Sequence, residues 1–133
     1  MLNRTSTHWW GVVIDAPDAR ELARFYARLL GWQIVKDDPT WAAVAPGEGI
    51  AYLGFQTADG YERPVWPNAD DKQQMMMHID VEVDGLDDAV RLAIEAGAEL
   101  AAYQPQDTVR VMLDPAGHPF CLYIDPAAVG TTG

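Results

Sequence analysis

The stretch MHIDVEVD, residues 77–84, carries polar side chains whose types could do chemistry. Successive side chains of a strand point to opposite faces, so His78, Asp80 and Glu82 are expected to share one face. An imidazole beside carboxylates can hold a divalent cation or move a proton. Side chains two residues apart on a strand stand roughly 6.6 Å apart, so this row alone cannot enclose one ion. A metal site here needs a further donor, for which Gln56 and Cys121 are the candidates.

Cys121 is the only cysteine, which excludes an internal disulfide and fits a reducing cytoplasm. Its thiolate could bind zinc, or it could act as a nucleophile with His78 as its base. A buried thiol can also pack as a small hydrophobic group. His118 follows the turn Asp-Pro-Ala-Gly and is interpreted as a polar turn residue.

The elements that must position these residues repeat along the chain. In the first half, Asp18 and Glu21 have the spacing of a capping box, and apolar residues then recur with helical periodicity up to Gly31. In the second half, a helix is predicted over residues 86–96, and the spacing from Asp84 to Gly97 equals that from Asp18 to Gly31. Strands are predicted at 9–15, 32–36, 41–45, 50–56, 75–84, 98–104, 107–114 and 118–125.

This order predicts an α+β fold, in which two tandem βαβββ modules form one domain over residues 1–133. The modules span residues 8–56 and 75–125, and the connecting loop spans 57–74. We expect one curved mixed sheet with the helices outside and a concave face inside. Trp66, in the turn-rich loop, either packs on the body or closes over a ligand.

The face assignment follows from that architecture. Met77, Ile79, Val81 and Val83 should pack beneath a helix, whereas the row that begins at His78 should face the concavity.

Composition excludes several classes of partner. The formal net charge is −11, which disfavours binding to nucleic acid or to anionic membranes. No apolar run reaches about 18 residues and the first residues lack a secretory signal, so a cytoplasmic protein is expected.

Three stretches give the chain a family resemblance. DARELARFYARLLGW (18–32), MHIDVEVDGLDDAVRLAIEAGAEL (77–100) and LDPAGHPFCLY (113–123) resemble the two helical segments and the final turn and strand of the vicinal-oxygen-chelate superfamily. That superfamily includes glyoxalase I, extradiol dioxygenases, fosfomycin-resistance enzymes and bleomycin-resistance proteins. The combination of YLGFQ, a tryptophan–proline loop and HID is similar to a glyoxalase-like subgroup.

In the metal-dependent members, four strands each offer one ligand. The resemblance carries the third position to His78 and the fourth, usually glutamate, to Cys121. The first position falls on Gly11, which has no donor. The second falls on Tyr52 or Leu53, and Gln56 is available only in a shifted register.

The resemblance therefore implies a glyoxalase- or bleomycin-resistance-like protein that binds a small organic molecule in the concave face without a complete metal site. The expected ligand-binding residues are His78, Asp80, Gln56, Cys121 and Trp66. The alternative is a metal-dependent lyase, isomerase or dioxygenase with His78 as a metal ligand. A third interpretation is an interaction module whose concave side binds a partner chain. A homodimer is expected by analogy with similar proteins.

Overall fold

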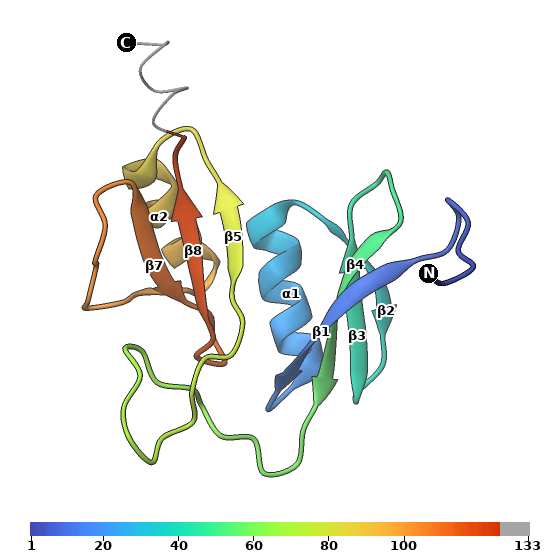
Figure 1. Ribbon diagram of the computed structural model, residues 1–133, viewed down its shortest axis with the longest axis horizontal. Helices are drawn as coiled ribbons and strands as arrows, with labels where there is room; N and C mark the ends of the chain where they lie inside the picture. Colours follow the sequence, from blue (N-terminus) through green and yellow to red (C-terminus); the bar gives the residue numbers. More distant parts are fainter. Residues whose placement is uncertain (126–133) are drawn as a thin grey trace. The chain divides into compact units, whose positions relative to one another are not determined.

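The computed structural model describes residues 1–125, and the chain divides into two compact units, Met1–Tyr61 and Glu62–Gly133 (Figure 1). Each unit holds one helix and one four-stranded mixed sheet. The elements are β1 (Trp10–Ala16), α1 (Ala19–Leu30), β2 (Gln33–Asp37), β3 (Trp41–Ala45), β4 (Ala51–Thr57), β5 (Ile79–Glu82), α2 (Leu86–Ala96), β6 (Glu99–Leu100), β7 (Val109–Leu113) and β8 (Pro119–Tyr123). The predicted α+β class with two βαβββ modules is confirmed.

Helix α1 begins and ends as its sequence predicts. The Asp18 side chain accepts hydrogen bonds from the backbone N–H groups of Arg20 and Glu21, at 3.0 and 3.4 Å. Gly31 ends the helix in the left-handed conformation with φ 70°, and its N–H donates to the Ala27 carbonyl. These caps fix where the chain leaves β1 and where it turns back toward β2.

The first sheet has the order β1-β4-β3-β2, with β1 parallel to β4 and the other neighbours antiparallel. One face packs on α1: Phe55 is fully buried, and its ring stacks on that of Tyr26 with centroids 5.5 Å apart. Because side chains alternate along β4, Tyr52, Gly54 and Gln56 lie on the opposite face. We call this opposite side of the first sheet the open face.

Strand β2 forms an edge of the first sheet, and all five of its residues are exposed. Its pairing with β3 shifts by one residue between Ile34 and Lys36, which is a β-bulge. Arg20 of α1 holds the end of β2 through an ion pair with Asp37, at 3.1 Å.

The second sheet has the order β5-β8-β7-β6, with β5 parallel to β8. Helix α2 contacts β6, β7 and β8, and Phe120, Leu122 and Met112 form the buried core of this unit. The predicted bounds of α2 are confirmed, but its N-cap is Gly85, which makes no side-chain capping bond. Asp84 therefore does not repeat the capping role of Asp18.

Strand β5 is shorter than predicted, because its partner β8 begins only at Pro119 and the pairing opens at Ile79 with Phe120. Met77 precedes the paired segment, and its side chain is 76% exposed. The prediction that Met77 packs beneath a helix is wrong. Ile79, Val81 and Val83 are half-buried, but α2 contacts β6, β7 and β8 and not β5, so the expected packing beneath a helix is not found for Ile79 and Val81 either.

Strand β6 is also shorter than predicted and covers only Glu99–Leu100. Beyond it, the amide side chain of Gln104 takes the place of a strand backbone. Its Oε1 accepts from the Val111 N–H, and its Nε2 donates to the Val111 carbonyl, both at 2.8 Å. The Val111 carbonyl also accepts from the Ala101 N–H at 3.0 Å, so backbone and side chain share this carbonyl, and the Gln104 side chain alone provides the acceptor for the Val111 N–H.

The connecting segment between β4 and β5 holds an isolated bridge from Val65 to Gln74. Trp66 packs with its ring 6.3 Å from the Tyr103 ring, between centroids. Within residues 1–125, neither helix is long and apolar enough to cross a membrane.

Candidate functional site

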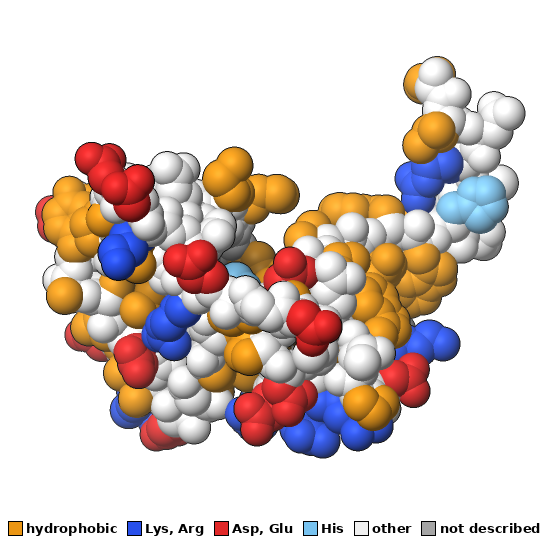
Figure 2. All heavy atoms as spheres, turned by 90° about the horizontal axis from the view of Figure 1, so that it is seen from below, with side chains coloured by type: hydrophobic (Ala, Val, Ile, Leu, Met, Phe, Trp, Pro, Cys, Tyr) orange, Lys and Arg blue, Asp and Glu red, His pale blue; other side chains and the backbone are white. Residues whose placement is uncertain are grey.

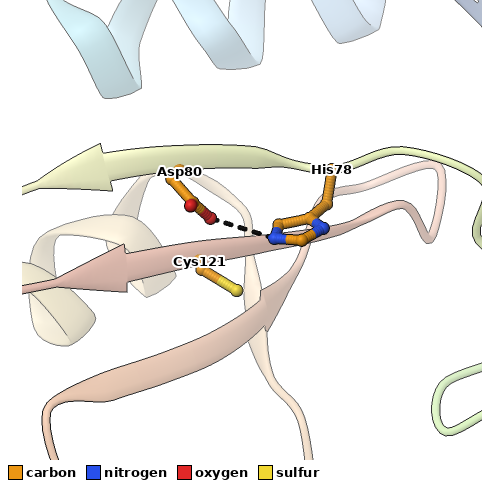
Figure 3. Close-up of side chains that lie close together, drawn as sticks. All are labelled: His78, Asp80 and Cys121. Atoms are coloured by element: carbon orange, nitrogen blue, oxygen red, sulfur yellow. Dashed lines mark ion pairs between the residues drawn. The ribbon is translucent and has the colours of Figure 1, made fainter.

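Three predicted residues lie together on the second sheet. Asp80 of β5 is the register partner of Cys121 of β8, and His78 immediately precedes β5. Figure 3 shows the three side chains on the same side of these two strands, with the His78 Nε2 atom 3.0 Å from Asp80 Oδ1. One nitrogen, one oxygen and one sulfur donor atom from the three residues all lie within 4.8 Å of one another. We call this group the His–Asp–Cys cluster.

The cluster forms one wall of an open hollow of about 310 Å³ in the second unit. This volume is near the lower end of the range typical of small-molecule pockets. The lining residues are His78, Asp80, Gln106, Thr108, Val109, Cys121, Tyr123 and Ile124.

The loop that completes the hollow is held by one arginine side chain. Arg110 Nη1 donates to the carbonyls of Asp107 and Val109, at 3.0 and 2.9 Å, and more weakly to that of Gln106, at 3.4 Å. The Ile124 N–H donates to the Thr108 carbonyl at 3.1 Å and ties the loop to the chain after β8. The lining of the hollow is therefore anchored from both β7 and the end of β8.

The Cys121 thiol is kept protonated by its surroundings. Burial is the largest cause, and the charge of Asp80 and a hydrogen bond to Asp80 add to it, so the pKa of Cys121 rises from 9.0 to about 11. A thiol with so high a pKa is a poor nucleophile at neutral pH. This argues against the interpretation in which Cys121 attacks a substrate with His78 as its base.

The other predicted site residues lie elsewhere. Gln56 belongs to the first unit, where its Nε2 donates to Asp15 Oδ1 at 2.6 Å. Trp66 does not line the hollow, and its role as a ligand contact stays a prediction. Glu82 is exposed on β5 and is likewise not part of the lining.

His118 does more than occupy a polar turn position. Its Nδ1 lies 2.8 Å from Oδ2 of Asp114, a carboxylate that is 1% exposed. Asp114 Oδ1 also accepts from the N–H groups of Ala116 and His118, both at 2.9 Å. The pair therefore fixes the turn between β7 and β8.

The family resemblance places two of its four metal-ligand positions in the first unit, at Gly11 and at Tyr52 or Leu53. Gly11 has no side chain, and a Cβ atom added there would stand 2.6 Å from the Tyr52 ring. The space in which a ligand at position 11 would lie is thus filled by that ring. Leu53 cannot coordinate a metal and is buried on the helix side.

Sequence reasoning missed the lining residues Gln106, Thr108 and Tyr123. Tyr123 follows Cys121 by two residues, so strand alternation could have placed it on the same face. Gln106 and Thr108 lie in the loop before β7, where no periodicity indicates which side chains turn toward the hollow.

Comparison with known proteins now assigns the class. A family model described as a glyoxalase-like domain matches residues 11–123, so the chain belongs to the glyoxalase-like domain family. The resemblance seen in the sequence is confirmed. No curated protein matches the chain significantly.

Solved structures share the fold at low sequence identity. A glyoxalase/bleomycin resistance protein/dioxygenase family enzyme from Burkholderia phytofirmans PsJN has a TM-score of 0.64 at 21% identity, over 86% of this chain and 95% of that one. A glyoxalase-related enzyme from Fulvimarina pelagi has a TM-score of 0.63 at 17% identity, over 94% and 90%. A glyoxalase/bleomycin resistance protein from Albidiferax ferrireducens T118 has a TM-score of 0.61 at 15% identity, over 89% and 98%.

Proposed function

We propose that this protein binds a small polar organic molecule in the hollow of the second unit. The observation that carries the proposal is the hollow itself, about 310 Å³, with the His78–Asp80 pair in its wall. Hydrogen-bonding side chains from several segments converge on a space of ligand size, which is typical of a binding site.

Each polar group has a distinct use in this proposal. The Asp80 carboxylate accepts hydrogen bonds from the ligand, and the His78 imidazole donates or accepts according to its tautomer. The Gln106 amide and the hydroxyl groups of Thr108 and Tyr123 supply further donors and acceptors around the rim. The protonated Cys121 thiol donates to Asp80, so its sulfur offers a ligand a weak acceptor at neutral pH.

The proposal is tested by screening a fragment library of cationic, neutral and anionic polar compounds against the full chain by protein-observed NMR. We expect hits to shift the amide signals of Asp80, Thr108 and Cys121. We expect His78→Ala to weaken those hits by about tenfold, the value of one hydrogen bond to a charged or strongly polar group. Glu82→Gln is the matched control, because Glu82 shares the strand but does not line the hollow. Hits that shift other regions only, or that Glu82→Gln weakens equally, contradict the proposal.

A second candidate function is divalent metal binding by the His–Asp–Cys cluster, and the closeness of its three donor atoms favours it. Imidazole, carboxylate and thiolate are all ligands of zinc, and structural or catalytic zinc sites use at least three protein donors. This donor set lies within the second unit, whereas two of the four ligand positions of the family fall in the first unit.

Titration with Co²⁺ distinguishes this candidate from a metal-free pocket. If the cluster binds metal, equimolar Co²⁺ gives the near-ultraviolet absorption of a cobalt–thiolate bond, which Cys121→Ser removes and Zn²⁺ displaces. His78→Ala should weaken Co²⁺ binding at least tenfold, whereas Glu82→Gln should leave it unchanged. A spectrum without the thiolate band rejects the metal candidate and leaves the pocket proposal standing.

A further inference from the structure

Two methionines are exposed in the segment that leads into β5. Met76 is 80% exposed and Met77 is 76% exposed, and they follow Met75, which is half-buried. Met112, in the core of the second unit, is fully buried. The chain thus presents two neighbouring thioether side chains to solvent directly before His78, which lines the hollow.

The surroundings of these two methionines do not resemble a docking surface. Residues 67–74, which precede Met75, are all exposed and mostly polar or charged. Figure 2 shows that hydrophobic side chains, in orange, are also exposed beside acidic and basic ones over the face in view. Such exposure is ordinary on protein surfaces and indicates no partner by itself. The property that separates Met76 and Met77 from other exposed apolar residues is the reactivity of their sulfur.

A thioether reacts with hydroperoxides by taking up one oxygen atom. The sulfur lone pair attacks one oxygen of the peroxide, an S–O bond forms, and the O–O bond breaks. The proton of the hydroperoxide moves to the leaving oxygen, which departs as water or as an alcohol. The sulfur loses two electrons and the peroxide gains two. No proton leaves the methionine, so the rate should vary little with pH.

Two other sulfur atoms of the chain are protected from this reaction by different means. Met112 is closed off from solvent, with an exposed fraction of 0%. Cys121 is half-buried, and burial together with the charge of Asp80 raises its pKa to about 11. At pH 7, roughly one thiol in 10,000 is then the thiolate that reacts with peroxide.

We propose that Met76 and Met77 form a site at which hydroperoxides convert methionine to methionine sulfoxide, while Cys121 in the hollow stays reduced. Oxidation of a core methionine disrupts packing, because the sulfoxide is polar. At Met76 and Met77 the added oxygen meets water, so the fold should tolerate it, and a sulfoxide reductase can reach the product. This inference goes beyond the proposed function, since it needs no ligand in the hollow.

The test exposes the full chain to dilute hydrogen peroxide at pH 6.5 and assigns the added oxygen by tandem mass spectrometry of peptides. We expect Met76 and Met77 to react at about the rate of the fully exposed Met1, and at least tenfold faster than Met112. Cys121 should react more slowly than Met76 and Met77. Between pH 6 and pH 8 the methionine rates should stay constant, whereas the Cys121 rate should rise about tenfold for each pH unit.

Controls separate the effect of the fold from that of the reagent. In urea, Met76 and Met112 should react at rates within about a factor of two of each other, because the fold no longer shields either. The double variant Met76→Leu, Met77→Leu should lose this oxygen uptake, and Met75→Leu, the matched control, should keep it. The circular dichroism spectrum of the oxidised natural protein should match that of the reduced protein. The proposal is wrong if Met76 and Met77 react no faster than Met112 in the folded chain, if Cys121 reacts before them, or if their oxidation unfolds the protein.

Discussion

Replacing Asp114 with alanine should lower the free energy of unfolding by about 3 kcal/mol, a large part of the stability of a small protein. The Asp114 carboxylate is 1% exposed and accepts from the N–H groups of Ala116 and His118 and contacts the His118 ring. Alanine leaves those partly buried N–H groups without this acceptor, and each such loss costs about 1–3 kcal/mol. Urea unfolding followed by circular dichroism measures the change.

Asparagine at position 114 separates the contribution of the hydrogen bonds to stability from the contribution of the carboxylate charge. Asp114→Asn keeps an oxygen acceptor for the two backbone N–H groups and should lose about half as much stability as Asp114→Ala. Asp84→Ala is the surface control, because Asp84 is exposed and does not cap α2. If Asp114→Ala lowers the free energy of unfolding by less than about 0.5 kcal/mol, the turn between β7 and β8 does not depend on the carboxylate.

Alkylation of Cys121 by iodoacetamide at pH 8 should be about tenfold slower in the folded protein than in urea. With a pKa of about 11 instead of 9.0, the thiolate fraction at pH 8 falls roughly a hundredfold. The more basic thiolate is intrinsically more nucleophilic, which recovers roughly a factor of ten. The rate should therefore keep rising with pH toward 11 instead of levelling near 9, as measured by mass spectrometry over short exposures.

Asp80→Asn removes the charge that helps to raise the pKa of Cys121, and it leaves burial, the largest cause, and an amide oxygen that can still accept from the thiol. Its alkylation should be faster than that of the natural protein and slower than that of the unfolded chain, with Glu82→Gln unchanged. The raised pKa contributes stability that is complete below pH 9 and is lost as the pH rises toward 11, so folding is checked at each pH. Natural protein that reacts as fast as the unfolded chain would contradict the assigned environment of Cys121.

The sequence predicts the elements of the fold correctly where neighbouring residues alone determine the structure, as at the ends of the helices. The Asp18 cap, the Gly31 terminus and the bounds of α2 follow from residues that act within one turn of the helix. The ends of β5 and β6 could not be predicted, because they depend on partners distant in sequence. Pairing of β5 opens where β8 begins, at Ile79 with Phe120, and beyond Ala101 the Gln104 side chain provides the acceptor for the Val111 N–H.

Some features of the candidate site could likewise be predicted from the sequence, whereas others depend on contacts between distant strands. Strand alternation and the family resemblance indicated His78, Asp80 and Cys121, and the structure brings these three together. The resemblance treated Gly11 only as a missing ligand, and no sequence pattern shows that the Tyr52 ring fills the space above it. That packing depends on the register between β1 and β4, which becomes visible only when the strands are paired.

The bulge in β2 has a consequence for association between molecules. A straight, exposed edge strand offers unpaired N–H and C=O groups to any other extended chain and can seed fibrils. In β2, the shift between Ile34 and Lys36 breaks the regular spacing of those groups, and the lysine adds a charge that an incoming strand would have to desolvate. At the corresponding edge of the second sheet, β6 is only two residues long and offers too short a template. Pairing with another chain is thus disfavoured at β2 by the bulge and the charge of Lys36, and at β6 by the short length of the strand.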